Sequence, residues 1–374
     1  MLSKPRVAIV FEYATLNGGE RSMLAALDEL KDSPFEFVAV APDEDPLAES
    51  LHLRGLRHVP FCCRDANGTR IPRELLLPKL LTTLRSLGPA IVHANSLSMG
   101  RLIGAISDEL DVPTVSHLRD ILKLSAATIA ELNQNTLLLA VSQATRDFHV
   151  AQGLDAERTR VVYNGVDCGL FRPEPKVPGV RRTMQIPDDA FIALTVGQIG
   201  PRKGLDILLD AALRVQAERP DVYFVLVGTR NSSKEESVNF ERALFMRIGA
   251  EHLADRIRVM GDVPDVERLM RNSDLLVHAA RQEPLGRVLL EAAACGLPIV
   301  ATDVGGTSEI LDDGLSARLV PAGDATSLAN AIIEMRDNPQ QRVSFGKAAR
   351  HRAVEKFSIS EAAWNLESVW REFL

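Results

Sequence analysis

The sequence has few of the features that mark secreted or membrane-spanning proteins. Its 374 residues include four cysteines, Cys62, Cys63, Cys168 and Cys295, and no Cys-x-x-Cys pair. Because adjacent cysteines rarely bridge each other, we expect reduced thiols in a reducing compartment. No run of about 18 apolar residues occurs, and the apolar stretch after Arg6 lacks the length and cleavage site of a signal peptide. We therefore expect a cytoplasmic protein, with peripheral attachment at the inner face of the membrane as an alternative.

Positive charge, metal-ligand spacings and two nucleotide motifs are also missing. The net charge is -7 at pH 7, so no basic field is available to hold nucleic acid, and we expect no nucleic-acid partner. The eight His residues show neither H-x-x-x-H nor H-E-x-x-H spacing, so no bound metal is expected. No G-x-G-x-x-G follows a predicted strand and no G-x-x-x-x-G-K-[ST] occurs, which argues against a nicotinamide dehydrogenase and a P-loop nucleotide triphosphatase.

The sequence does contain a regular alternation of short apolar runs and helical periodicity. With 46% hydrophobic residues, a chain of this length can give each of two domains its own core. Alternating strands and helices predict parallel sheets with helices on both faces. The expected strands are Arg6 to Phe11, Phe35 to Ala41, Ile91 to Ala94, Thr114 to His117, Leu137 to Val141, a run from Ile192, Val222 to Val227, Ile257 to Met260, Leu275 to His278 and Pro298 to Thr302.

One segment, from Val161 to Pro175, interrupts this alternation with Asn-Gly, a further Gly and two Pro. The alternation restarts at Ile192, so we interpret the segment as a linker between two similar domains. The expected fold is α/β, with two doubly wound Rossmann-like domains, residues 1–168 and 169–358, that face a central cleft. A last helix is expected from about Ser360 to Leu374. Ligands of such folds bind beside the carboxyl ends of strands, so the loops after strands are the candidate site.

Two of these loops suit a phosphate. Gly18 and Gly19 lie just before a helix, where small residues let backbone amides approach a phosphate, although a turn that merely needs positive φ is the alternative. Arg202 and Lys203 follow the strand that begins at Ile192 and open a helix. Cations at a helix N-terminus oppose the helix dipole, so we expect them to have an anionic partner.

A third candidate is the stretch from Glu283 to Glu309, "EPLGRVLLEAAACGLPIVATDVGGTSE". We expect a helix that starts near Leu285, because Pro284 and Gly286 suit a first turn and "VLLEAAAC" is strongly helical. Its free amides would offer a second anion site. Glu283 before the helix and Glu291 within it would then bind hydroxyls of one elongated ligand. The alternative is that Glu283 only favours the helix dipole and that Glu291 is a solvated helix residue.

Taken together, these motifs resemble the retaining nucleotide-sugar glycosyltransferases of family 4 (glycosyl transferases group 1), which have the GT-B fold. The resemblance rests on Glu283-x7-Glu291 followed by "CGLPIVATDVGGTSEIL", with "NGGERS", "VSQAT", "NGVD" and "GPRKG" in the family's order. It implies transfer of a sugar from a nucleotide diphosphate-sugar to an acceptor with retained anomeric configuration, without a tightly bound metal or other cofactor. The acceptor would be an unidentified glycan, lipid-linked molecule or small molecule. Residues 1–168 would form the acceptor-side domain, 169–358 the donor domain, and 359–374 a helix that crosses back.

The resemblance also implies roles for individual residues. Glu283 would lie by the donor sugar, Lys203 and Arg202 would face the diphosphate, and His117 would lie near the reacting centre. The implied donor-binding residues are Gly18, Gly19, Gln198, Met260, Val263, Leu285, Gly286, Arg287 and Glu291. Among them, Glu291 would bind the ribose and the segment with Met260 and Val263 would follow the nucleobase.

The sequence departs from the family pattern at three positions. Gln198 stands where an Arg is common, so one phosphate cation is missing, and Ala280 stands where a Ser is frequent. Arg287 stands where an aliphatic residue is usual. Because helical side chains lean toward the N-terminus, we hypothesise that Arg287 replaces the missing cation. A surface Arg whose stem covers nearby leucines is the alternative.

The sequence leaves other functions open. A sugar-nucleotide epimerase or a phosphorylase of similar architecture would use related phosphate contacts for other chemistry. A non-catalytic sugar-nucleotide-binding protein would keep the site without turnover. Asp43-Glu44-Asp45 matches the D-x-D motif of metal-dependent transferases, but an acidic solvated loop accounts for this tripeptide as well.

Overall fold

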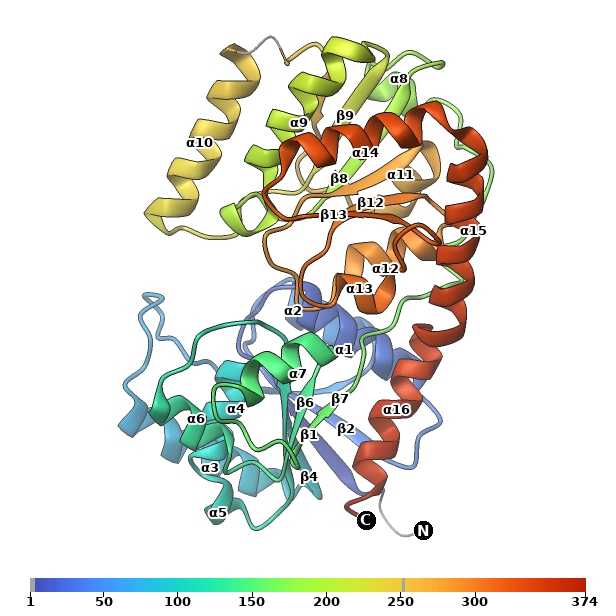
Figure 1. Cartoon of the computed structure of the whole chain (residues 1–374). Helices are drawn as coiled ribbons and strands as arrows, with labels where there is room; N and C mark the ends of the chain where they lie inside the picture. Colours follow the sequence, from blue (N-terminus) through green and yellow to red (C-terminus); the bar gives the residue numbers. More distant parts are fainter. Residues whose placement is uncertain (1–3, 251–252) are drawn as a thin grey trace. The chain divides into compact units, whose positions relative to one another are not determined.

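The computed structural model describes residues 4–250 and 253–374, which fall into two compact units (Figure 1). The first unit contains residues 4–165 together with 359–374, and the second contains Val166–Ser358. The division after Gly165 lies slightly before the expected boundary at residue 168. The last helix of the chain belongs to the first unit, although the whole second unit separates it in sequence from the rest of that unit.

The first unit is built on a parallel sheet with the strand order β3-β2-β1-β4-β5-β6-β7. Its strands are β1 (Arg6–Val10), β2 (Glu36–Ala41), β3 (Arg57–Pro60), β4 (Ile91–Ala94), β5 (Thr114–Leu118), β6 (Leu137–Ala140) and β7 (Thr159–Val161). Its helices are α1 (Gly18–Glu29), α2 (Leu47–Leu53), α3 (Arg73–Leu87), α4 (Leu97–Gly104), α5 (Ser107–Leu110), α6 (Ala126–Leu132), α7 (Gln143–Val150) and α16 (Ile359–Arg371).

Helices cover both faces of this sheet, because successive residues of each strand point to opposite faces. Val7 and Ile9 of β1 belong to a core cluster with α1, α2 and α16. Ala8 and Val10 belong to a second cluster with α3 and α4. Helix α16, drawn in red in Figure 1, packs beside α1, and its Trp370 is completely buried.

The second unit repeats this architecture with the strand order β10-β9-β8-β11-β12-β13. Its strands are β8 (Phe191–Val196), β9 (Val222–Val227), β10 (Ile257–Val259), β11 (Leu275–His278), β12 (Ile299–Thr302) and β13 (Arg318–Val320). Its helices are α8 (Val180–Thr183), the 3-10 turn η1 (Pro201–Lys203), α9 (Leu205–Glu218), α10 (Glu235–Ala250), α11 (Val266–Asn272), α12 (Arg287–Ala294), α13 (Thr307–Ile310), α14 (Ala325–Asp337) and α15 (Pro339–Lys356).

The predicted α/β architecture, with two doubly wound parallel sheets, is confirmed. In each sheet the strand order reverses once, between β1 and β4 and between β8 and β11. Such switch points leave room for a ligand beside the carboxyl ends of the strands. The loops that follow these four strands hold most of the residues described below.

Three strands were not predicted, namely β3, β7 and β13. Each is three or four residues long and lies at the edge of its sheet. Edge strands bury only part of their surface, so their sequences, such as "RHVP" for β3, contain polar residues and Pro instead of an apolar run.

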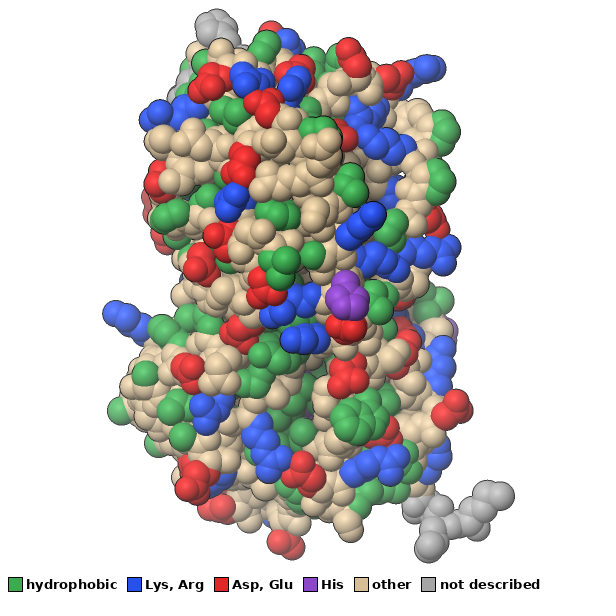
Figure 2. Space-filling view, turned by 45° about the vertical axis from the view of Figure 1, so that its right-hand side comes forward, with side chains coloured by type: hydrophobic (Ala, Val, Ile, Leu, Met, Phe, Trp, Pro, Cys, Tyr) green, Lys and Arg blue, Asp and Glu red, His purple; other side chains and the backbone are tan. Residues whose placement is uncertain are grey.

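The surface carries both signs of charge. On the face drawn in Figure 2, basic and acidic side chains are interspersed over both units. Within the described part of the chain, no helix is both long and apolar enough to cross a membrane.

Candidate functional site

A buried carboxylate with basic partners lies at the switch point of the second unit. Glu283, in the loop after β11, accepts hydrogen bonds from Lys203 Nζ at 2.5 Å and from His278 Nε2 at 3.0 Å. Arg202 Nη1 lies 3.8 Å from its other oxygen. The Glu283 side chain is only 8% exposed and that of Lys203 is 13% exposed. The strand ends of β8 and β11 therefore bring three of the four predicted catalytic residues together.

Charge keeps this carboxylate ionised. Burial alone would raise the pKa of Glu283, but the Lys203 ammonium and the hydrogen bond from His278 hold it well below its usual value. Burial lowers the pKa of His278, so its ring is neutral near pH 7 and its Nε2–H is the donor to Glu283. The anionic partner that we expected for Arg202 and Lys203 is thus supplied by the protein itself.

Backbone contacts hold the loops of this cluster in place. Arg281 N donates to Arg202 O at 2.8 Å, and Gly306 N donates to Glu283 O at 3.0 Å, which joins the loops after β8, β11 and β12. Gly204 has φ +63, and a Cβ there would lie 1.9 Å from the carbonyl oxygen of Ala279. Only glycine fits where these two loops touch.

The next helix begins later than predicted. Helix α12 starts at Arg287, because Gly286 has φ 106, outside the helical region, and serves as the N-cap. Leu285 is buried in the preceding turn. Arg287, the first residue of α12, donates from Nη2 to Oε1 of Glu291, one turn further along the helix, at 2.8 Å. Glu291 is buried and is therefore not the solvated residue of our alternative interpretation.

The other predicted donor-binding residues of this unit lie on neighbouring loops. Gln198 is exposed in the turn after β8. Met260 and Val263, after β10, are half-buried. A backbone bond from Gly228 to Gly261 joins the loops after β9 and β10. The structure thus places Gln198, Met260 and Val263 on loops that follow strands. None of the three is a hydrogen-bond partner of the Glu283 carboxylate, whose partners within the described residues are Lys203 and His278.

In the first unit, His117 lies at the end of β5 in a chain of three rings. Its Nδ1 lies 2.9 Å from Nε2 of His93 on β4. On the other side of His93, Trp370 Nε1 of helix α16 lies 3.1 Å from Nδ1. All three side chains are buried. Burial, together with the charge of Arg119, lowers the pKa of His93 to about 3 and that of His117 well below its usual value, so both rings are neutral.

Arg119, directly after β5, connects the strand ends of the first unit. Its guanidinium donates to Asn95 Oδ1 and to Asn164 Oδ1, both at 2.8 Å, and its Nη2 lies 3.3 Å from His117 Nδ1. The side chain passes over Gly19, where a Cβ would lie 2.9 Å from Arg119 Cδ. Gly18 and Gly19 do not have positive φ, so the alternative of a turn that needs positive φ is wrong. At Gly19 the small residue makes room for Arg119.

Sequence reasoning missed three residues of these clusters, namely His278, His93 and Arg119. A usable signal was present for each. His278 and His93 are polar residues in otherwise apolar strands, "LLVH" and "IVHA", and Arg119 follows His117 by two positions. A lone polar residue at the carboxyl end of a buried parallel strand needs a partner, and a neighbouring strand end can supply one.

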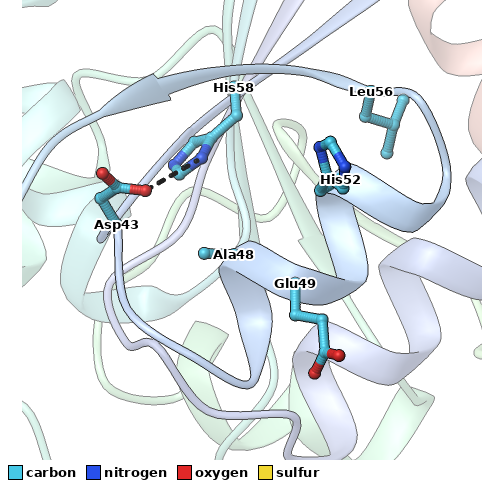
Figure 3. A pocket seen from close by; sticks show the side chains of 6 residues that line it. All are labelled: Asp43, Ala48, Glu49, His52, Leu56 and His58. Carbon is cyan, nitrogen blue, oxygen red and sulfur yellow. Dashed lines mark ion pairs between the residues drawn. The ribbon is translucent and has the colours of Figure 1, made fainter.

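A separate pocket lies at the β2–β3 edge of the first unit and has a volume of about 460 Å³ (Figure 3). Asp43, from the D-x-D tripeptide, lies 3.8 Å from His58 Nδ1 there, and His58 Nε2 bonds Ala41 O. Asp45 accepts from the backbone amide of Glu49. Among the described residues, no three His, Cys, Asp or Glu side chains are grouped closely enough to hold a metal ion.

Two family models match successive parts of the chain. The model described as "Glycosyltransferase Family 4" matches residues 16–170, and the model described as "Glycosyl transferases group 1" matches residues 179–352. The two matches leave only the ends and a short linker uncovered.

The curated proteins similar to this chain include two glycosyltransferases and a spore coat protein. A D-inositol 3-phosphate glycosyltransferase of Thermobispora bispora is 29% identical over 305 residues, which cover 76% of this chain and 71% of the relative. D-inositol 3-phosphate glycosyltransferase 2 of Catenulispora acidiphila is 36% identical over 220 residues, 56% of this chain and 50% of the relative. Spore coat protein SA of Bacillus subtilis is 30% identical over 58% of this chain and 59% of its own length.

Solved structures share the fold over the full length. Anabaena HepE, crystallised in complex with UDP and glucose, has a TM-score of 0.86 at 24% identity and covers 98% of this chain and 99% of its own. A glycosyltransferase of Rickettsia africae has a TM-score of 0.86 at 19% identity, with 99% and 98% covered. Identities this low indicate a common fold.

Proposed function

The chain belongs to the family 4 glycosyltransferases of the GT-B fold, and on this basis we propose that it moves a sugar from a nucleotide diphosphate donor to an acceptor. We further propose that the anomeric configuration is retained and that no bound metal takes part. The observation that carries this proposal is the ionised Glu283, held by Lys203 and His278 beside Arg202 at the switch point of the second unit.

Lys203 and Arg202 can take the part that a metal ion plays in other transferases. As the bond between the sugar and the diphosphate breaks, negative charge grows on the leaving phosphate, and fixed cations stabilise that charge. A lysine ammonium has three N–H donors, and one of them is used on Glu283. Lys203 can therefore keep its contact with Glu283 while it donates to a phosphate oxygen.

Glu283 fits a role in positioning the sugar better than a role as nucleophile. One of its oxygens already accepts hydrogen bonds from both Lys203 and His278, which reduces its basicity and fixes its direction. In the proposed reaction the bond from the anomeric carbon to the diphosphate oxygen breaks and a bond to the acceptor oxygen forms on the same face. The acceptor proton passes to the departing phosphate oxygen, so no covalent sugar-protein intermediate is needed.

Glu291 and Arg287 are the proposed nucleotide contacts. Glu291 is buried one turn inside α12 and has oxygens that can accept from two ribose hydroxyls. In the first unit, His117 is the residue that we propose to contact the substrate. A crystal structure of HepE in complex with UDP-glucose makes this the first donor to test, and the names of the curated relatives make an inositol phosphate the first acceptor.

The test is transfer by the full chain in EDTA. The protein is incubated with UDP-, GDP- and ADP-sugars and a panel of acceptors, and the product's anomeric configuration is read by NMR. Glu291→Ala should fold normally and lose about 2 to 4 kcal/mol of donor binding. A transfer product with inverted configuration, or activity that EDTA abolishes and a divalent cation restores, would overturn the finer proposal. Epimer formed from the donor alone, or sugar phosphate released with inorganic phosphate, would identify different chemistry.

A further inference from the structure

Three buried rings of the first unit are joined by hydrogen bonds that point in one direction. Trp370 Nε1 lies 3.1 Å from His93 Nδ1, and His93 Nε2 lies 2.9 Å from His117 Nδ1. Trp370 packs against Phe35 and Phe37, with ring centroids 6.1 and 5.4 Å away, so its indole is held in place. The chain runs from helix α16 through β4 to β5.

The donor properties of Trp determine where the protons lie along this chain. An indole N–H can only donate, so His93 must accept through Nδ1. A neutral His carries one proton, which for His93 is therefore on Nε2. That proton points at Nδ1 of His117, which must accept it in turn. The single proton of neutral His117 then lies on Nε2.

Arg119 gives independent support for this assignment. Its Nη2 also lies 3.3 Å from His117 Nδ1, and a guanidinium has donors only. Two donors thus converge on the same nitrogen of His117, and the 2.9 Å bond from His93 is the stronger, because the Arg119 contact is 3.3 Å long and cannot fix the tautomer alone. Such a nitrogen has a lone pair and no hydrogen.

The other nitrogen of His117 is left for a ligand. His117 Nε2 is buried and has no hydrogen-bond partner among the described residues. The ring lines a small cavity with Arg119, Asn164 and Leu366 of helix α16, all from the same unit. A buried polar hydrogen without a partner is costly, so an oxygen acceptor beside Nε2 would gain a strong contact.

We propose that Trp370 is a positioning residue that fixes the tautomer of His117 through His93, so that His117 presents Nε2–H as a hydrogen-bond donor to an oxygen of the bound substrate. His117 is then neither a general base nor a cation. The contact with substrate rests on the proposed function, whereas the control of the tautomer does not, because it depends only on side chains of the first unit.

The experiment reads the tautomers directly in the full-length protein. Long-range 1H–15N spectra of protein labelled with 15N-histidine distinguish protonated from unprotonated ring nitrogens. The signals are assigned with two variants, His117→Gln and His93→Gln, each of which lacks the signal of the replaced residue. In wild type we expect unprotonated Nδ1 and protonated Nε2 for both. Trp370→Phe keeps an aromatic ring but removes the N–H, and it should shift His93 and His117 toward mixtures of the two tautomers.

The chain offers a matched control for this variant. It contains two tryptophans, both on α16, and Trp364 is 61% exposed. Trp364→Phe should leave both tautomers unchanged. If Trp370→Phe does not fold, the Trp364→Phe protein can be made with benzothienylalanine, a near-isosteric Trp analogue with sulfur in place of N–H, at position 370.

Two results would overturn the proposal. One is a protonated Nδ1 on His117 in wild type. The other is a His117 tautomer that stays fixed in folded protein without the indole N–H. Neither result depends on turnover, so both differ from failure of the proposed transferase reaction. With a substrate identified, loss of the N–H should lower kcat more than it raises KM, and the analogue and Trp370→Phe should agree.

Discussion

Replacing Lys203 by Met should destabilise the second unit strongly, whatever it does to catalysis. The variant removes the ammonium that lies 2.5 Å from Glu283 and leaves the carboxylate 8% exposed. At an effective dielectric constant of about 20, two opposite charges at this distance attract each other by roughly 7 kcal/mol. Most of this attraction only compensates for the hydration that both groups lose on burial. Removing one partner of a buried pair costs about 3 to 5 kcal/mol. Because His278 and Arg202 still contact Glu283 in Lys203→Met, we expect the free energy of unfolding to fall by about 3 kcal/mol, the lower end of this range.

The loss should depend on pH in a defined direction. In wild type the pKa of Glu283 is lowered, so its stabilising contribution is fully present above the unfolded-state pKa of about 4.3 and is lost progressively as pH falls from there through the much lower folded-state pKa. Without Lys203 we expect burial to raise this pKa, so the folded state is penalised above pH 4.3 and relieved below it. The difference between variant and wild type should therefore be largest near pH 7 and should shrink progressively as pH falls through 4 toward the lowered wild-type pKa of Glu283.

Hydrogen exchange of peptides from β8 and β11 measures the stability of the second unit directly. Tryptophan fluorescence would not, because both tryptophans lie in the first unit. Lys176→Met is the matched control, because Lys176 pairs with Asp274 at 2.9 Å but is 53% exposed, and should cost less than about 1 kcal/mol. Adding Glu283→Gln to Lys203→Met should recover most of the stability. A loss below about 1 kcal/mol, equal at pH 4 and pH 7, would refute the reasoning.

Two further predictions concern α12 and the loop before α9. Arg287→Ala should reduce kcat/KM for the donor about tenfold or more, since a guanidinium that binds a phosphate contributes roughly 1.5 to 3 kcal/mol. Adding Gln198→Arg should restore much of the lost kcat/KM. An unchanged kcat/KM in Arg287→Ala would mean that Arg287 serves only its pair with Glu291. Gly204→Ala should destabilise the second unit by more than about 2 kcal/mol in urea unfolding, because the new Cβ meets the Ala279 carbonyl. Gly179→Ala, also at positive φ but with open space around it, is its control, and equal losses would show that backbone strain alone matters.

Buried strands were predicted from the sequence more accurately than exposed ones. Central strands such as β4 and β9 were predicted to the residue, because a short apolar run between polar or turn-forming residues is typical of a buried parallel strand. Of the four edge strands, β10 was predicted, but β3, β7 and β13 were missed, since their short, half-exposed sequences lack an apolar run. The family was also readable from the motifs, because their order along the chain is specific.

The site was predictable in composition but not in pairing. The sequence brought Glu283 and Lys203 into one prediction, yet only the folded loops reveal that each is the other's partner. The start of α12 was misplaced because Gly286 suits a first turn by composition, whereas its φ of 106 excludes it from the helix. The contact of Trp370 with His93 joins residues 277 positions apart, and no local pattern indicates it.

The discontinuity of the first unit has a consequence for biosynthesis. At roughly 5 to 20 residues per second, the ribosome adds Trp370 about 14 to 55 seconds after His93. The second unit, which is continuous in sequence, is synthesised within this interval and is complete before α16 is added, while the earlier unit still lacks the helix that packs over Val7 and Ile9. Until α16 is added, the apolar residues that it covers, Val7 and Ile9 among them, lack this packing partner. Chaperones that bind exposed apolar surface would bind the first unit during this interval and release it once α16 has packed against α1.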